Sequence, residues 1–376
     1  MNLEFEERDT ELLEFWQKIV KNEIQSLAIE IDKVGVISES VLSILRKAEL
    51  LKPFLPKELG GEGKGLFSLT LMLEEFGKVS PSLAFFIENQ VILGIRATHK
   101  HSNHPEKDKM VIEASEFKFI VALAATEVSA GADLSLIESK STLENEKVKI
   151  SGEKSFVNWA SKSDGILTLT KNTEGEINNV SLTFVPINSP GVQIFQPIST
   201  MGMRGLEPSP VCLTDTTIGK EWLFGVYGYG MDIFNRIMKE LRIGTAAISV
   251  GIAQGAFNES SQFAKTRKQF GKPVGSFQSL QWRFSDAAMK IDASRLHVWR
   301  AAQEASEKTF FGTNSALAKL YATESACWVT DFSAHVMGSK GYVQGGLSER
   351  LLRDARFLRI CHGSSEILKN LIAESL

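Results

Sequence analysis

The stretch Arg353–Glu366, RDARFLRICHGSSE, separates two helical patterns near the end of this 376-residue chain. Apolar residues recur at helical spacing through Leu347–Leu358, and a second amphipathic run follows after Gly363. Ser364 or Ser365 is suited to cap the second helix with its hydroxyl. The stretch therefore predicts a helix, a tight turn and a further helix.

His362 lies in this turn, just before the second helix is expected to start. The peptide dipoles of a helix direct their positive ends at that position, which disfavours a charged imidazolium. A neutral imidazole can accept a proton near pH 7. The stretch by itself favours a structural histidine packed at a helix corner. The rest of the chain favours a functional histidine instead.

Composition excludes several classes of protein. Charged residues make up 23% and hydrophobic residues 43%, with a net charge of −3, so nucleic acid is not an expected partner. No apolar stretch is long enough to span a membrane, and the acidic segment MNLEFEERDT lacks the apolar core of a signal peptide. Three cysteines without a CxxC pair suit a reducing compartment. We expect a cytoplasmic protein.

The texture of the sequence divides the chain into three parts. Helical periodicity dominates residues 1–117 and 226–376, and the second of these ranges predicts a bundle of about four helices. Short β-prone runs separated by turn residues predict an antiparallel β-domain over residues 118–225. The fold class is thus α+β and multi-domain. No glycine-rich phosphate loop follows any expected strand, so a Rossmann dinucleotide site is not supported.

The segment His99–His104 holds three histidines in six residues. No nearby ligand completes a recognisable metal-binding spacing, and Pro105 interrupts the segment. We interpret it as a hydrophilic loop and expect no metal site.

Six motifs, in chain order, resemble those of the acyl-CoA dehydrogenase family. They are ATEVSAGAD at Ala125–Asp133, SGEKSFVN at Ser151–Asn158, MGMRG at Met201–Gly205, TRKQFGKP at Thr266–Pro273, GSKGY at Gly338–Tyr342 and ERLLRDAR at Glu349–Arg356. The resemblance runs nearly from end to end. It implies a flavoprotein that binds FAD between the β-domain and the C-terminal bundle, assembled as a homodimer or homotetramer.

The resemblance also implies a set of cofactor-binding residues. They are Thr126, Phe156, Asn158, Arg267, Phe270, His335 and Ser364. The first three would line the flavin, whereas Arg267 and Phe270 would hold the FAD of a neighbouring subunit, with His335 at a position where the family usually has glutamine. An arginine fork suits a pyrophosphate because it can donate two parallel hydrogen bonds. The alternatives are a surface arginine and, for Phe156, an ordinary core aromatic.

Two further departures from the family pattern concern the flavin site. Asn158 stands where the family has a hydroxyl residue near flavin N5, although an amide can still donate a hydrogen bond there. Ala132 stands where a serine is common near the pyrophosphate. Each change removes a hydroxyl from the expected site.

The catalytic base is the third departure. His362 occupies the position where the best-known members carry a glutamate that removes the α-proton. Other members carry the base on the long bundle helix, and that position is Leu241 here. Glu240 is one residue away and would be rotated by about 100° around the helix. Both usual carboxylates are therefore missing.

These observations predict a FAD-dependent acyl-thioester dehydrogenase with His362 as its catalytic residue. The base would remove the α-proton while flavin N5 accepts the β-hydride. The acyl group would be carried by CoA or an acyl carrier protein, and an electron-acceptor protein or oxygen would reoxidise the flavin. Two alternatives stay open: a flavin-dependent monooxygenase or oxidase on the same fold, and a catalytically silent subunit of a hetero-oligomer.

Overall fold

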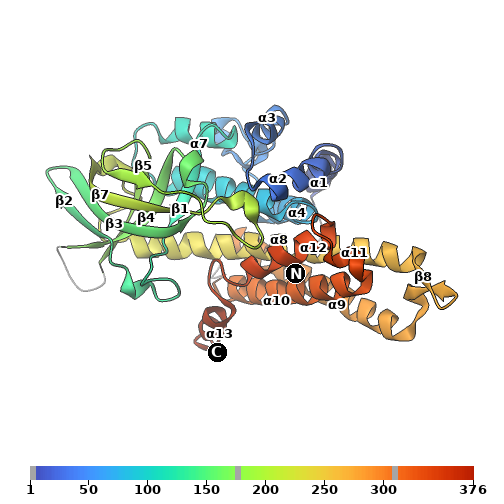
Figure 1. Ribbon diagram of the computed structural model, residues 1–376. Coiled ribbons are helices and arrows are strands. Elements are labelled where there is room, and N and C mark those ends of the chain that lie inside the picture. The colour runs from blue at the N-terminus through green and yellow to red at the C-terminus, as the bar shows by residue number, and fades with distance from the viewer. Residues whose placement is uncertain (1–5, 174–178, 307–311) are drawn as a thin grey trace.

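The computed structural model describes residues 6–173, 179–306 and 312–376. The first five residues of the acidic N-terminal segment lie outside the described residues. The expected order of helical domain, β-domain and helical domain is confirmed. Figure 1 shows the β-sheet at one end of the long C-terminal helices, with the N-terminal helices packed along one side of both.

The regular elements of the N-terminal domain, within its described residues, are all helices. Its helices are α1 Glu7–Ile19, α2 Gln25–Val34, α3 Glu39–Lys47, α4 Leu66–Gly77, α5 Pro81–Asn89, α6 Thr98–His101 and α7 Lys107–Ser115. A π-helical segment, Gln90–Ala97, continues α5. Every residue of α5 is buried, and Pro81 occupies its first turn, where the missing N–H costs nothing. This helix therefore carries its side chains into the centre of the molecule.

The central sheet is mixed rather than antiparallel throughout. Its strands are β1 Val121–Ala124, β2 Lys140–Glu144, β3 Lys147–Val157, β4 Gly165–Asn172, β5 Val180–Pro186, β6 Val192–Ile194 and β7 Ser209–Gly219. The order is β1-β4-β2-β3-β7-β6, with β5 on β4. Both β1 and β2 pair with β4 in parallel, against our expectation. The β2–β3 hairpin lies between β1 and β4 in sequence, so the connection is long enough for a parallel crossover.

The C-terminal domain is built on one very long helix. Its elements are α8 Gly230–Thr266, β8 Lys268–Gln269, β9 Lys272–Pro273, α9 Gln278–Ser306, α10 Gly312–Met337, α11 Ser339–Tyr342, α12 Leu347–Leu358 and α13 Ser365–Ala373. The helical pattern of the sequence extends to Phe270, whereas α8 ends at Thr266. The cause is local: Phe270 and Gly271 have φ of 50° and 80°, which turns the chain into the β8–β9 hairpin.

The three domains are fastened together near α12. A Cβ on Gly202 would lie 2.4 Å from the carbonyl carbon of Arg353, so the loop after β6 packs directly on the α12 backbone. The backbone N–H of Met203 donates to the buried Asp354 carboxyl. Arg353 forms a bidentate ion pair with Asp32 of α2, with both N–O distances 2.8 Å. Two motifs that are distant in sequence, MGMRG and ERLLRDAR, thus pack against each other.

Candidate active site around His362

A tight turn carries His362 between α12 and α13. His362 and Gly363 both have positive φ, 52° and 102°, a conformation that reverses the chain within two residues. Ser364 is the N-cap of α13, since its hydroxyl accepts a hydrogen bond from the Ile367 N–H at 3.4 Å. The helix, turn and helix expected from the sequence are confirmed, with Ser364 rather than Ser365 as the cap.

The imidazole of His362 is held on one face and at one nitrogen. Its ring stacks on Phe85 of α5, with centroids 5.2 Å apart and planes 8° apart. Nδ1 lies 2.8 Å from the Thr245 hydroxyl of α8. Among the described residues, no hydrogen bond involves Nε2. His362 as a whole residue is partly exposed, and Nε2 is the ring nitrogen left to meet a ligand.

Aromatic contacts place this imidazole where the three domains meet. Phe85 also contacts Trp159, with ring centroids 6.1 Å apart. The indole N–H of Trp159 donates to the Gly205 carbonyl at 2.8 Å, in the MGMRG loop. Trp159 directly follows Asn158, which we expected to lie beside the flavin. One aromatic chain therefore links His362 to the end of β3.

Two cations surround the turn. Arg242 Nε donates to the His362 carbonyl at 3.1 Å, and Lys319 Nζ donates to the Gly363 carbonyl at 2.7 Å. Within the described part of the chain, neither forms an ion pair with a carboxylate. Burial, Lys319 and Arg242, in that order, lower the pKa of His362 to about 3. The ring is neutral near pH 7, as expected, but burial is the main cause rather than the helix start.

A buried carboxyl lies behind the imidazole. Glu88 of α5 is fully buried, and its Oε1 accepts a hydrogen bond from the Thr245 hydroxyl at 3.2 Å. Glu88 Oε2 is buried and has no hydrogen-bond partner among the residues that the structure describes. Burial raises the pKa of Glu88 well above its ordinary value. Thr245 thus connects this carboxyl to His362.

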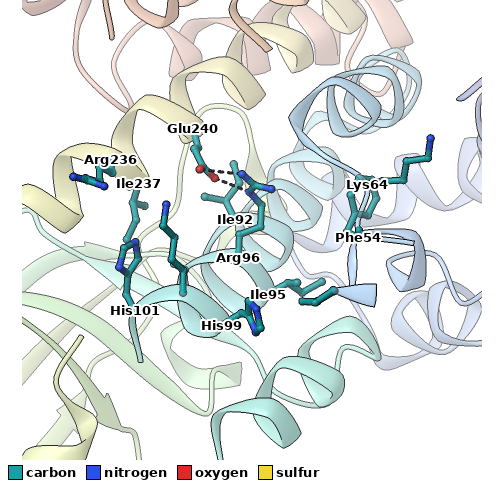
Figure 2. Close-up of a pocket in the computed structure, with 14 residues that line it drawn as sticks. Phe54, Lys64, Ile92, Ile95, Arg96, His99, His101, Arg236, Ile237 and Glu240 are labelled. Carbon is teal, nitrogen blue, oxygen red and sulfur yellow. Dashed lines mark hydrogen bonds and ion pairs between the residues drawn. The ribbon is translucent and has the colours of Figure 1, made fainter. Parts of the chain in front are cut away.

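Neither of the usual base positions carries a carboxylate that faces His362. Leu241 is fully buried. Glu240 points away, as the helical rotation predicts, and forms hydrogen bonds of 2.7 and 3.0 Å with Arg96 (Figure 2). That ion pair lies beside a cavity of about 380 Å³, together with His101 and Arg236. Glu240 is therefore paired with Arg96 and does not face His362.

The histidines of the segment His99–His104 do not converge. His99 Nε2 lies 3.3 Å from Glu58, while the ring centroid of His104 lies 4.2 Å from that of Trp222, with the two rings tilted by 36°. His99 and His101 both line the cavity beside Glu240, with their rings apart from each other (Figure 2). In the residues that the structure describes, no group of three His, Cys, Asp or Glu side chains could hold a metal ion.

Two of the β-domain residues expected near the flavin, Thr126 and Phe156, lie on neighbouring segments. Phe156 is 56% exposed, so it is not an ordinary core aromatic. It lines a cavity of about 430 Å³ with Val128 and Phe195, and Val128 is 95% exposed. The Ser155 N–H donates to the Thr126 carbonyl at 2.9 Å, which holds the two motifs side by side. An apolar, open wall of this kind fits a flat aromatic ring.

The other expected cofactor residues lie at the far end of the bundle. Arg267 and Phe270 follow α8 and are exposed, Phe270 by 93%. The exposed His335 is in the last turn of α10, at the same end, because Lys340 just beyond it lies 5.8 Å from the Phe263 ring. The 37 residues of α8 span about 55 Å. Figure 1 shows the β8–β9 hairpin at the end opposite the sheet.

Family models match all three domains of the chain. The N-terminal, middle and C-terminal domains of acyl-CoA dehydrogenase match residues 6–115, 122–216 and 228–376. A probable acyl-CoA dehydrogenase of Bacillus subtilis, YngJ, is 31% identical over 379 residues, covering 100% of both chains. The chain belongs to the acyl-CoA dehydrogenase family.

One further relative and two solved structures are similar to this acyl-CoA dehydrogenase family member over nearly its whole length. Cyclohex-1-ene-1-carbonyl-CoA dehydrogenase of Geobacter metallireducens is 30% identical, covering 97% of this chain and 96% of the relative. A structure described as the electron transferring flavoprotein of Acidaminococcus fermentans has a TM-score of 0.95 at 25% identity, covering 100% and 99%. Butyryl-CoA dehydrogenase from Megasphaera elsdenii shares the fold, with a TM-score of 0.95 at 23% identity and the same coverage.

Sequence reasoning missed three residues of this family member's candidate site. Glu88 had a usable signal, because it is an acidic residue inside the apolar run LAFFIENQVIL. Lys319 had a similar signal, because it is a charged residue inside an alanine-rich helical pattern. Thr245 had none, since a threonine is unremarkable in any helix. Within the described residues, no helix combines the length and apolar character needed to cross a membrane.

Proposed function

We propose that this chain is a FAD-dependent acyl-thioester dehydrogenase in which His362 removes the α-proton. The observation that carries the proposal is the neutral, partly exposed imidazole, held at Nδ1 by Thr245 and free at Nε2. A general base must present an unpaired acceptor atom to the substrate, and Nε2 is that atom. The names of the relatives support an acyl-CoA substrate, and an acyl carrier protein is the other candidate carrier.

Each neighbour of His362 has a part in this reaction. Stacking on Phe85 fixes the plane of the ring, and Thr245 fixes its rotation. The cations of Arg242 and Lys319 oppose a positive charge on His362 and stabilise negative charge that develops on the acyl group as its α-proton leaves. Bound FAD would accept the β-hydride.

The exposed residues at the two ends of α8 support a homo-oligomer. Phe156, which lines the β-domain cavity, would hold the flavin ring of the chain's own FAD. Thr126 and Asn158 are proposed to line the same flavin on the family resemblance. Arg267, Phe270 and His335 would hold the FAD of another subunit, because a single cofactor cannot reach both ends of one chain. We propose a homodimer or a homotetramer, with Ser364 near the cofactor through its place beside His362.

The electron acceptor is proposed to be an electron-transferring flavoprotein, in line with the Acidaminococcus structure named above, with oxygen as the alternative. Cytoplasmic placement stays a prediction.

The test is an anaerobic titration of the purified holoprotein with a panel of acyl-CoA and acyl-carrier substrates. Bleaching of the flavin absorbance near ~450 nm by one of them is expected. His362→Ala should lower the rate of bleaching by about 10²–10⁴-fold and leave FAD content unchanged. Product formation that requires oxygen and a flavin reductase would favour a monooxygenase. Copurification with a fixed partner chain and no bleaching would favour a silent subunit.

A further inference from the structure

We propose that Glu88 is the terminal proton acceptor of this site, receiving the proton from His362 through the hydroxyl of Thr245. The inference rests on the proposed function and deepens it. Glu88 would take the part of the missing catalytic carboxylate, and the proton would reach it through His362 and Thr245. Nothing in the six family motifs includes Glu88 or Thr245.

The geometry is continuous. Thr245 Oγ1 lies 2.8 Å from His362 Nδ1 and 3.2 Å from Glu88 Oε1. The contact with His362 has an ordinary hydrogen-bond length, whereas the contact with Glu88 is a long hydrogen bond. Thr245 and Glu88 are fully buried, while His362 is partly exposed. A proton can therefore enter at the imidazole and move inward along groups that water does not reach.

One hydroxyl proton couples the states of the two outer groups. When Glu88 is ionised, Thr245 donates to it and must accept from Nδ1–H, so the Nε2 lone pair is free. When Glu88 is protonated, it donates to Thr245, which then donates to Nδ1, and the ring proton sits on Nε2. Only the first arrangement makes His362 a base toward a ligand at Nε2.

The proton transfers balance. The acyl Cα–H bond breaks and an Nε2–H bond forms. The Nδ1 proton moves to Thr245 Oγ1, and the hydroxyl proton of Thr245 moves to Glu88 Oε1. The electron pair left on Cα would form the Cα=Cβ bond, and bound FAD would supply the acceptor for the β-hydride. His362 ends neutral and Glu88 ends as a carboxylic acid, and the reverse transfers return the proton to solvent through the partly exposed His362.

The charges around the turn explain why the proton would not stay on His362. An imidazolium would lie beside Lys319 of α10 and Arg242 of α8. The pKa of His362 is about 3, so this ring binds an extra proton only weakly near pH 7. Glu88, whose pKa burial raises well above its ordinary value, holds a proton more readily than His362 does. The relay therefore operates only above the pKa of Glu88, where the carboxylate is ionised before the proton arrives. The remaining titratable neighbour, Cys361, stays a thiol because burial raises its pKa to about 12.

Gly244 makes the contact between α5 and α8 possible. A Cβ at this position would lie 2.3 Å from Glu88 Oε1, so only glycine leaves room for the carboxyl beside Thr245. The unpartnered Glu88 Oε2 also fits a group that alternates between ionised and neutral forms, because a permanently charged oxygen there would be costly.

The first test reads the tautomer of His362 without any catalysis. The holoprotein is labelled with ¹⁵N-histidine, and the His362 signals are assigned by their loss in His362→Gln. We expect a neutral ring with its proton on Nε2 at low pH and on Nδ1 at high pH. The switch should vanish in Thr245→Val, persist in Thr245→Ser, and be unchanged in Thr330→Val, a matched change of a buried threonine whose hydroxyl bonds only its own helix.

A single tautomer at every pH in the native protein, or a switch that survives in Thr245→Val, would overturn the relay. Because the readout is a ring proton and not turnover, it stands whichever reaction the protein catalyses.

The second test measures the rate of flavin reduction by the substrate that the anaerobic titration identifies. Thr245→Val and Glu88→Gln should each slow it by about 10²-fold, with Thr245→Ser restoring most of the rate. Glu240→Gln, a carboxylate change on the other side of α8, should leave it unchanged. Loss of activity in His362→Gln with full activity in Glu88→Gln would refute the relay alone. Full activity in His362→Gln would refute the proposed base itself.

Discussion

Gly244 of α8 lies against Glu88 of α5, with a hypothetical Cβ only 2.3 Å from the carboxyl oxygen Oε1. This approach decides how close the N-terminal domain comes to the turn that carries His362. The relationship links a helix contact to the candidate chemistry, because the same oxygen accepts the hydrogen bond from Thr245.

Gly244→Ala should therefore displace Glu88 from Thr245. We expect a loss of about 1–3 kcal/mol in the free energy of unfolding, measured by urea denaturation, because one methyl group overpacks the contact. The pH-dependent tautomer switch of His362 should weaken as well. Gly131→Ala, where a Cβ would meet nothing within 4 Å, is the control and should change neither quantity. A fully stable Gly244→Ala protein with an intact switch would contradict the prediction.

Lys319→Met should raise the pKa of His362. The cation of Lys319 is the second cause of the lowered pKa, after burial, so the pKa should rise from about 3 yet stay below its ordinary value of 6.5. The measurement is a ¹⁵N titration of the ring. Stability should fall by about 1–3 kcal/mol, because the Gly363 carbonyl loses its donor. The exposed Lys340→Met is the control, and an unshifted His362 pKa would show that Lys319 does not act on the ring.

Asp354→Asn should change how stability depends on pH. Burial raises the pKa of Asp354 to about 6, from 3.8 in the unfolded chain, so the folded state binds the proton more tightly. This contribution is present below pH 3.8 and is lost as pH rises through about 6. Compared with the native protein, Asp354→Asn should gain on the order of 3 kcal/mol between pH 4 and pH 7 in urea unfolding. Asparagine can still accept from the Met203 N–H, and parallel pH curves would contradict the assignment.

Arg267→Ala should weaken FAD binding and subunit association together. Losing a charge-assisted hydrogen bond to a pyrophosphate should cost about 2 kcal/mol in FAD affinity, measured by fluorescence titration. Unfolding of the chain should change by no more than about 0.5 kcal/mol, because Arg267 is exposed. Lys265→Ala, also exposed and two residues earlier, is the matched control. Unchanged FAD affinity in Arg267→Ala would remove this residue from the cofactor site.

Local patterns determined a large part of this protein from its sequence. The apolar spacing of Leu347–Leu358 predicted α12, and the hydroxyls of Ser364 and Ser365 predicted that one of these two residues caps α13. Helix periodicity and capping depend on residues within one or two turns. The six motifs predicted the family and the order of its domains, and the rotation of one residue on a helix predicted that Glu240 faces away.

Only the tertiary structure decided what surrounds His362. Glu88, Thr245 and Lys319 come from α5, α8 and α10, and no local pattern connects three helices so far apart in sequence. The parallel pairing of β1 with β4 was also set by a long crossover connection, which the periodicity of single segments does not reveal. The pKa of a side chain depends on its burial and on nearby charges, so the basicity of this site follows from packing rather than from residue type.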